Sequence, residues 1–218
     1  MSERVIYTIG RQFGSGGRLV GRQLAEKLSI PFYDRDLLEI AARDSGVPEK
    51  LFRAADEKTS NNVLYSLMME GFNNPMSDGT DNSLSDLPIN DQLFLLQAST
   101  IKKLASQGSC VIVGRCAEYV LREDPDLISI FIKAPLSERA KRAVEVYGAS
   151  RFRSEEVCEK NDKVRANYHN YYSDSKWGMC RAYTLTLDSS VIGIEGCVEA
   201  IIKYTELRDK KRAESQES

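Results

Sequence analysis

Histidine is almost absent from this chain, and other residue types that mark common chemistries are scarce or scattered. The only histidine among the 218 residues is His169, which argues against a histidine-based triad and a histidine-rich metal site. The five cysteines form no CxxC pair and no zinc-ligand spacing. An odd, scattered set of this kind is typical of reduced thiols in the cytosol.

The chain also lacks an excess of one charge and a long apolar run. Its 30 Lys and Arg residues nearly balance 32 Asp and Glu residues, giving a net charge of −2, so a dedicated nucleic-acid binder is not expected. No apolar segment approaches the length of a membrane-spanning helix, and the N-terminus has no signal-peptide core. We therefore expect a cytoplasmic protein with neither membrane nor nucleic acid as partner, and its oligomeric state stays open.

A glycine-rich stretch near the N-terminus organises the rest of the chain. Residues 5–9 predict a short buried strand, four glycines follow between positions 10 and 17, and apolar residues then recur at helical spacing. A strand, a glycine turn and a helix together direct backbone N–H groups and a helix N-terminus at an anion. We predict a phosphate cradle made of Gly14, Ser15, Gly16, Gly17, Arg18 and Leu19.

This turn departs from the Walker A pattern, GxxxxGK followed by Ser or Thr. Neither possible frame supplies a lysine followed by a hydroxyl residue. Arg18 can replace the lysine charge, because a guanidinium binds phosphate through two parallel hydrogen bonds. Ser15 is then the only hydroxyl of the turn that is a candidate Mg²⁺ ligand.

Five apolar segments separated by helical patterns predict the fold class. The expected strands are 5–9, 30–36, 110–114, 127–132 and 183–187, and the last helix is expected at 194–207. Strands that alternate with helices form right-handed units of a parallel sheet. We predict a three-layer α/β fold with helices on both faces of a five-stranded parallel sheet. Ligands of such sheets bind at the carboxyl ends of the strands.

Acidic residues close the second of these strands. Asp34 and Asp36 flank Arg35, and two carboxylates so placed can hold Mg²⁺ through water or orient an acceptor. Alternatively, Asp34 caps the helix that opens at Leu37. Arg35 is either a contact to an acceptor phosphate or a solvated residue.

Arginines follow the later strands, and phosphoryl transfer needs such positive charge around two phosphate-bearing ligands. Arg115 follows the most apolar strand and should lie over the ligand crevice. Arg139 and Arg142 lie three residues apart on one predicted helix, and Asp162 and Arg165 have the same spacing on a later one.

Between residues 56 and 90 the composition changes to Asn, Ser, Asp, Gly and Met. We interpret residues 44–91 as a mobile insertion, partly helical near 63–69. It is either a lid or binding lobe, or a disordered loop without function. The charged tail 208–218 is expected to fray.

In their order and spacing these segments resemble the cytidylate kinase-like branch of the P-loop nucleoside-monophosphate kinases. The matching pieces are residues 8–25, 113–115, 131–135 with Arg139 and Arg142, 162–168 and 185–190. The resemblance implies one P-loop NTPase domain over residues 1–218. It also implies that the insertion 44–91 binds the acceptor and that residues 148–176 form a lid and the helix after it.

The same resemblance implies transfer of the ATP γ-phosphoryl group to a nucleoside monophosphate with the help of Mg²⁺. It implies that Arg115 contacts the acceptor phosphate, and that Arg139 and Arg142 resemble arginines that close on ATP with the lid. Arg153 is then a lid arginine, and Asp162 and Arg165 resemble the segment after the lid, which we expect to bind substrate.

One departure from the family leaves the substrate open. Cytidylate kinases carry a base-reading aspartate where this chain has Cys116. Two alternatives to a nucleoside-monophosphate kinase therefore remain. One is a nucleotide-binding regulatory homologue without turnover. The other is a small-metabolite kinase, since residues 32–36 also resemble the acidic segment of shikimate- and gluconate-type kinases.

Overall fold

The computed structural model describes residues 4–34, 36–51 and 87–216. Arg35 and the predicted helical stretch 63–69 lie outside the described residues. The chain divides into two compact units, one made of residues 1–33 and 108–218 and the other of residues 34–107.

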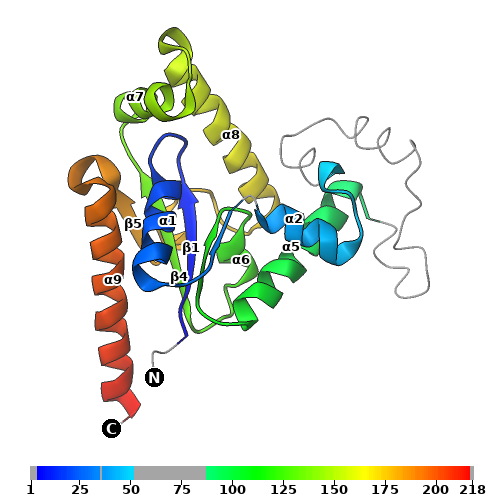
Figure 1. The fold of residues 1–218 in the computed structure, drawn as a ribbon, viewed down its shortest axis with the longest axis vertical. Helices are drawn as coiled ribbons and strands as arrows, with labels where there is room; N and C mark the ends of the chain where they lie inside the picture. The colour runs from blue at the N-terminus through cyan, green and yellow to red at the C-terminus, as the bar shows by residue number, and fades with distance from the viewer. Residues whose placement is uncertain (1–3, 35, 52–86, 217–218) are drawn as a thin grey trace. The chain divides into compact units, whose positions relative to one another are not determined.

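A five-stranded parallel sheet forms the centre of the first unit, in the order β2-β3-β1-β4-β5 (Figure 1). Its strands are β1 (Ile6–Arg11), β2 (Phe32–Tyr33), β3 (Cys110–Val113), β4 (Leu127–Lys133) and β5 (Leu185–Asp188). The central strand β1 pairs with two neighbours, so that Ile9 lies opposite both Val113 and Ile130. The predicted parallel sheet is confirmed, and all strands end at the same edge.

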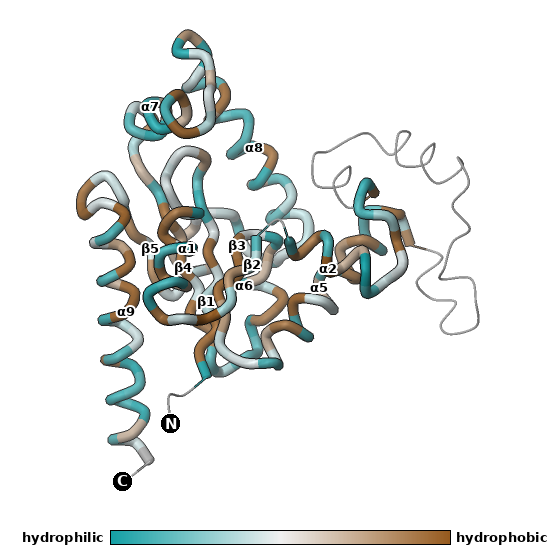
Figure 2. Tube along the Cα trace, in the orientation of Figure 1, coloured by the Kyte–Doolittle hydropathy of each residue, from teal (hydrophilic) through white to brown (hydrophobic). Residues whose placement is uncertain are grey.

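Helices of the first unit cover this sheet. They are α1 (Gly17–Leu28), α6 (Ala117–Val120), α7 (Leu136–Tyr147), α8 (Ser154–Tyr172) and α9 (Ser189–Gln216), with short 3₁₀ turns η2 (Arg151–Arg153) and η3 (Cys180–Ala182). Helices α1 and α9 lie side by side (Figure 1). Alternate residues of β1, Tyr7 and Ile9, pack with Leu24 of α1 and Ile201 of α9 in one buried cluster. Much of the central strands is accordingly hydrophobic (Figure 2).

The last helix differs from its predicted bounds. It begins at Ser189, has a non-helical residue at Gly193 (φ 70°, ψ 179°), and continues to Gln216. The helix therefore extends beyond its predicted end at residue 207, into the tail that is expected to fray. The physical reason is an anchoring contact, because Arg212 Nη1 lies 3.1 Å from the Asp126 carboxylate at the start of β4. No helix of the described ranges is long and apolar enough to cross a membrane.

The described part of the second unit contains α2 (Asp36–Ser45) and α5 (Ile89–Ser106). Leu38 and Ala41 of α2 pack against Leu93 of α5 in a small buried cluster. Lys103 Nζ donates to Asp44 Oδ2 at 2.7 Å on the surface of this pair. The second unit therefore has a core of its own.

Burial along α9 generates a stability prediction. Ile201 is 0% exposed, whereas Leu207 on the same helix is 57% exposed. We expect Ile201→Ala to lower the free energy of unfolding by about 3 kcal/mol, because it leaves a cavity between α9 and the sheet. Leu207→Ala, the matched control, should change it by less than about 0.5 kcal/mol in urea denaturation. Equal effects of the two substitutions would contradict the described packing.

Candidate phosphate-binding site

The glycine turn, residues 12–16, joins the end of β1 to the start of α1. Gly14 (φ 76°) and Gly16 (φ 81°) adopt the left-handed conformation, which glycine enters without a steric penalty. Gly16 stands at the N-cap of α1, and no side chain caps the helix there. The first N–H groups of a helix have no acceptor within it and carry partial positive charge. The turn therefore has the strand, glycine turn and helix geometry that the sequence predicts, and its binding of an anion stays a prediction.

Other helices approach the turn so closely that larger residues would not fit. A Cβ atom at Gly14 would overlap the carbonyl oxygen of Arg139 in α7, and one at Gly16 would overlap the side chain of Ile194 in α9. A Cβ atom at Gly17 would lie 2.5 Å from the Cβ of Arg11. Close packing against the backbone of α7 thus requires glycine at position 14, and at position 16 the left-handed backbone favours glycine.

Three predicted arginines converge here, and they donate to carbonyl oxygens of the turn or of the end of β1. Arg142 Nη1 donates to Gly14 O at 2.7 Å, and Arg139 Nη1 donates to Phe13 O at 3.2 Å. Arg165 Nη1 of α8 donates to Arg11 O at 3.1 Å, at the end of β1. The structure thereby brings together arginines that are far apart in the sequence. Each of them meets this region through a hydrogen bond to a backbone carbonyl.

A half-buried carboxylate completes this arrangement. Asp162 Oδ1 accepts the N–H of Phe13 at 2.6 Å, and its Oδ2 accepts Arg139 Nη1 at 2.6 Å. Burial raises the pKa of Asp162, against the lowering effect of the Phe13 N–H, Arg139 and Arg165. We call Phe13, Arg139 and Asp162 the turn clamp. Since Arg139 is only 6% exposed, we assign it and Asp162 a positioning role in place of the predicted direct contacts to ligands.

The predicted metal role of Ser15 is not supported by its placement. Ser15 is fully buried, and its hydroxyl donates to Gln12 O at 2.8 Å while accepting the N–H of Gly17 at 3.4 Å. Within the described ranges, no three His, Cys, Asp or Glu side chains gather as a metal site would require. Mg²⁺ that accompanies a nucleotide usually needs only one or two protein carboxylates.

A second turn follows the neighbouring strand at the same edge of the sheet. Gly114, Arg115 and Cys116 have φ angles of 76°, 63° and 52°, so all three are left-handed. We call these residues the Arg115 turn. Its position beside the glycine turn is fixed by the Gly114 N–H, which donates to Ile9 O at 3.0 Å.

The left-handed backbone of the Arg115 turn is strained. For a residue with a side chain this conformation costs about 1–2 kcal/mol. Such strain concentrates where a fold holds a functional residue in place. Cys116 is 4% exposed, and burial raises the pKa of its thiol far above the ordinary value, so it is not a reactive thiol.

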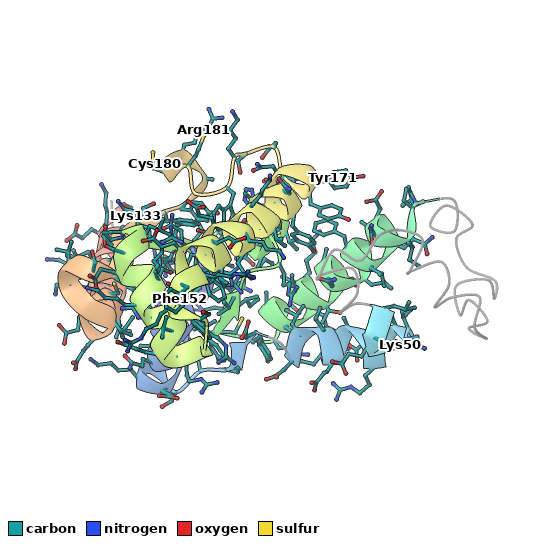
Figure 3. The ribbon with its side chains drawn as sticks, turned by 90° about the horizontal axis from the view of Figure 1, so that it is seen from above. Lys50, Lys133, Phe152, Tyr171, Cys180 and Arg181 are labelled. Atoms are coloured by element: carbon teal, nitrogen blue, oxygen red, sulfur yellow. The ribbon has the colours of Figure 1, made fainter. Side chains whose placement is uncertain are left out.

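The remaining predicted site residues have varied positions. Arg18 and Leu19 lie half-buried in the first turn of α1. Arg153 is exposed on η2, next to Phe152, which Figure 3 labels on the connection between α7 and α8. Asp34, which is 6% exposed, and Asp36, the first residue of α2, belong to the second unit.

Two residues that position the glycine turn were missed by the sequence analysis. Gln12 Oε1 accepts the N–H of Ala134 at 3.1 Å, which fastens the turn to the end of β4. Ser189 Oγ donates to Ser15 O at 2.6 Å from the start of α9. Ser189 lies in a segment that carried the family resemblance, whereas no pattern in the sequence marks Gln12.

Comparison with known proteins identifies the family. The model of the cytidylate kinase-like family matches residues 6–191, and the chain belongs to this family. A solved structure of an uncharacterized protein from Eubacterium ventriosum ATCC 27560 is 30% identical over 93% of this chain and 99% of its own, with a TM-score of 0.69. No curated protein sequence matches the chain.

Kinases are found among the more distant structural neighbours. A shikimate kinase from Bacteroides thetaiotaomicron is 13% identical, with a TM-score of 0.51 over 94% of this chain and 99% of its own. A gluconokinase from Sinorhizobium meliloti 1021 is 14% identical, with a TM-score of 0.51 over 95% of this chain and 97% of its own. These likenesses show that the fold is that of the P-loop kinases. A phosphotransferase is the class of activity that family and fold suggest.

The packing of the glycine turn can be tested with two glycines of similar φ. Gly14→Ala places a methyl group against the backbone of α7, whereas Gly148 (φ 67°) has nothing within 4 Å of its Cβ position. Both substitutions carry the left-handed penalty, and only Gly14→Ala adds overlap with a backbone that cannot yield. We expect it to cost about 1–3 kcal/mol more than Gly148→Ala in chemical denaturation. Equal losses would show that α7 does not press on the turn.

The turn clamp gives a second prediction. Asp162→Asn keeps the shape of the side chain but leaves the buried guanidinium of Arg139 without its counter-charge. We expect a loss of about 3 kcal/mol in unfolding free energy. Glu159→Gln, which removes an exposed carboxylate from the same helix, should have an effect below about 0.5 kcal/mol. If Asp162→Asn unfolds at the same urea concentration as the wild type, the turn clamp is ruled out.

Proposed function

We propose that this member of the cytidylate kinase-like family is an ATP-dependent phosphotransferase whose acceptor is a nucleoside monophosphate. The observation that carries the proposal is the pair of left-handed turns at one sheet edge. The glycine turn follows β1, and the Arg115 turn follows its neighbour β3. Phosphoryl transfer needs two phosphate-bearing ligands held side by side in a positive environment.

The glycine turn is assigned to ATP. Backbone N–H groups of the turn and of the first turn of α1 would hold the terminal phosphates, and Arg18 would supply the charge that lysine supplies in a Walker A motif. The guanidinium carbon of Arg142 would lie 3.6 Å from a Cβ atom at Gly16, so its charge adds to that of the helix end. ATP, when bound, supplies the γ-phosphoryl group, and Mg²⁺ neutralises part of the charge on its oxygens.

The Arg115 turn is assigned to the acceptor. A strained arginine fixed at the end of the strand next to β1 suits an acceptor that already carries a phosphate. This favours a nucleoside monophosphate over a small alcohol. Because Cys116 is buried and its thiol stays neutral, base recognition must use other residues. Asp34, Arg35 and Asp36 remain sequence-based proposals for the acceptor side, with Asp34 as the proposed Mg²⁺ contact.

Two regions of the first unit add to the proposal. Arg153 on η2 is exposed and is assigned to the transferring group in a closed state of residues 148–176. Arginine supplied on closure would stabilise the transition state and exclude water. Arg165 would act indirectly, through its hydrogen bond to Arg11 O.

A second candidate function is nucleotide binding without turnover. The observation that favours it is that Arg139, Arg142 and Arg165 all donate to backbone carbonyls of the glycine turn or of the end of β1. In a kinase that turns over, some of these guanidinium groups would be expected to contact phosphate oxygens. This candidate predicts ATP binding by calorimetry and no release of ADP with any acceptor.

A coupled ADP-release assay tests the proposed reaction. We expect turnover with at least one of CMP, UMP, AMP and GMP, and none with shikimate or gluconate. Arg115→Ala should raise the KM for the monophosphate about 10- to 100-fold, the loss of a charge-assisted hydrogen bond, while the KM for ATP changes little. Arg18→Ala should raise the KM for ATP by a similar factor, while the KM for the monophosphate changes little. Arg122→Ala, an exposed arginine beyond α6, serves as the control and should change neither.

The possible outcomes separate the candidates. ATP binding without turnover on any of the six acceptors would replace the kinase by the nucleotide-binding homologue. Turnover on shikimate or gluconate alone would move the acceptor to a hydroxyl of a small metabolite. If a folded sample does not bind ATP, both candidate functions are contradicted, because each of them assigns ATP to the glycine turn.

A further inference from the structure

A carboxylate and an imidazole face each other inside the first unit, away from the turn clamp. Glu118 Oε1 lies 2.9 Å from His169 Nε2, and the two side chains are 7% and 4% exposed. Glu118 belongs to α6, which starts directly after the Arg115 turn, and His169 belongs to the last turn of α8. Groups of this kind are seldom buried unless each compensates the other.

The imidazole has a polar contact at its other nitrogen as well. Ser173 Oγ donates to Ser175 O at 3.0 Å and lies 3.1 Å from His169 Nδ1. The His169 ring is therefore held from two sides, by Ser173 just after α8 and by Glu118 of α6.

Within the described residues, neither Glu118 Oε1 nor His169 Nε2 has a hydrogen-bond partner of ordinary geometry, so their contact at 2.9 Å is an ion-pair contact and not an aligned hydrogen bond. The Tyr183 ring lies beside the imidazole, with centroids 6.5 Å apart and planes 29° apart. Burial, and then the charge of Glu118, raise the pKa of the Tyr183 hydroxyl, so this neighbour stays neutral. Each member of the pair therefore depends on the other for its electrostatic stabilisation.

Helix α8 carries the histidine on the face that holds the glycine turn. Asp162, Arg165 and His169 are spaced i, i+3 and i+7, which places them on one side of a helix. Asp162 and Arg165 hold the glycine turn and the end of β1, as described above. His169 reaches the helix that follows the Arg115 turn. One face of α8 therefore contacts the supports of both turns.

From this juxtaposition we infer that Glu118 and His169 are positioning residues for Arg115. The pair ties α6 to α8 and thereby keeps the Arg115 turn in its strained left-handed conformation. The role assigned to the turn, binding the phosphate of the acceptor, rests on the proposed function. The mechanical link between α8 and the turn does not.

Hydrogen exchange tests the link without any substrate. In Glu118→Gln and in His169→Gln we expect amides of residues 112–121 to exchange about tenfold faster than in the wild type, because the turn opens locally. Amides of residues 9–20, which contain the glycine turn, should keep their rates. Glu159→Gln, on the exposed side of α8, is the control and should match the wild type throughout.

The double variant Glu118→Gln with His169→Gln provides a rescue. Two glutamine amides can hydrogen-bond to each other without charge, so the link is restored in neutral form. We expect exchange of residues 112–121 to return to within about threefold of the wild type. If either single variant fails to fold, comparison of the double variant with the other single variant still decides the point.

Kinetics then connect the link to Arg115. With the monophosphate that the wild type turns over fastest, the single variants should raise the KM for the acceptor about tenfold, leave the KM for ATP within about twofold, and be rescued in the double variant. A lower melting temperature with unchanged exchange at 112–121 and an unchanged acceptor KM would overturn the inference. If the wild type shows no turnover, the proposed function fails, and the exchange result alone decides whether the pair positions the turn.

Discussion

A glycine turn cannot fix its own shape, and the structure depends on the groups that fix it from outside. Glycine permits the left-handed backbone that directs N–H groups at an anion, but it also permits many other backbone conformations. Here the turn clamp holds both polar groups of Phe13, because Asp162 accepts its N–H and Arg139 donates to its carbonyl. Arg142 and Ser189 fasten the next two carbonyls. A flexible sequence thereby becomes a preorganised turn, as the proposed catalysis would require.

This constraint also decides how the arginines act. A guanidinium that donates to a backbone carbonyl shapes the site, and it contributes charge to a bound phosphate only at longer range. Arg142 does both, since it holds Gly14 O and lies close to Gly16. Arg139 is buried in the clamp, and its role is to hold the backbone of the turn in place. In the proposed function, positive charge from α1 and α7 would offset the absence of a Walker A lysine, and Arg18 is the residue assigned to direct contact.

The sequence predicted the sheet, the glycine turn and the helices that carry the arginines, because these features follow from apolar periodicity and from glycine clustering. It did not predict the partners of the arginines. A spacing of three residues says only that Arg139 and Arg142 share a helix face, and the turn that they meet is more than 120 residues away. The left-handed Arg115 and Cys116 have no sequence signal, since neither residue type favours that backbone. The pairing of His169 with Glu118 depends on tertiary packing that no local pattern contains.

The most direct test of the central claim is a crystal structure of the protein with a non-hydrolysable ATP analogue and the preferred monophosphate. We expect the terminal phosphates of the analogue at the N–H groups of residues 14–18, with Arg18 in contact and the turn clamp intact. We expect the acceptor phosphate within hydrogen-bonding distance of Arg115. A triphosphate bound elsewhere, or an Arg139 that leaves Asp162 to contact phosphate, would contradict this claim.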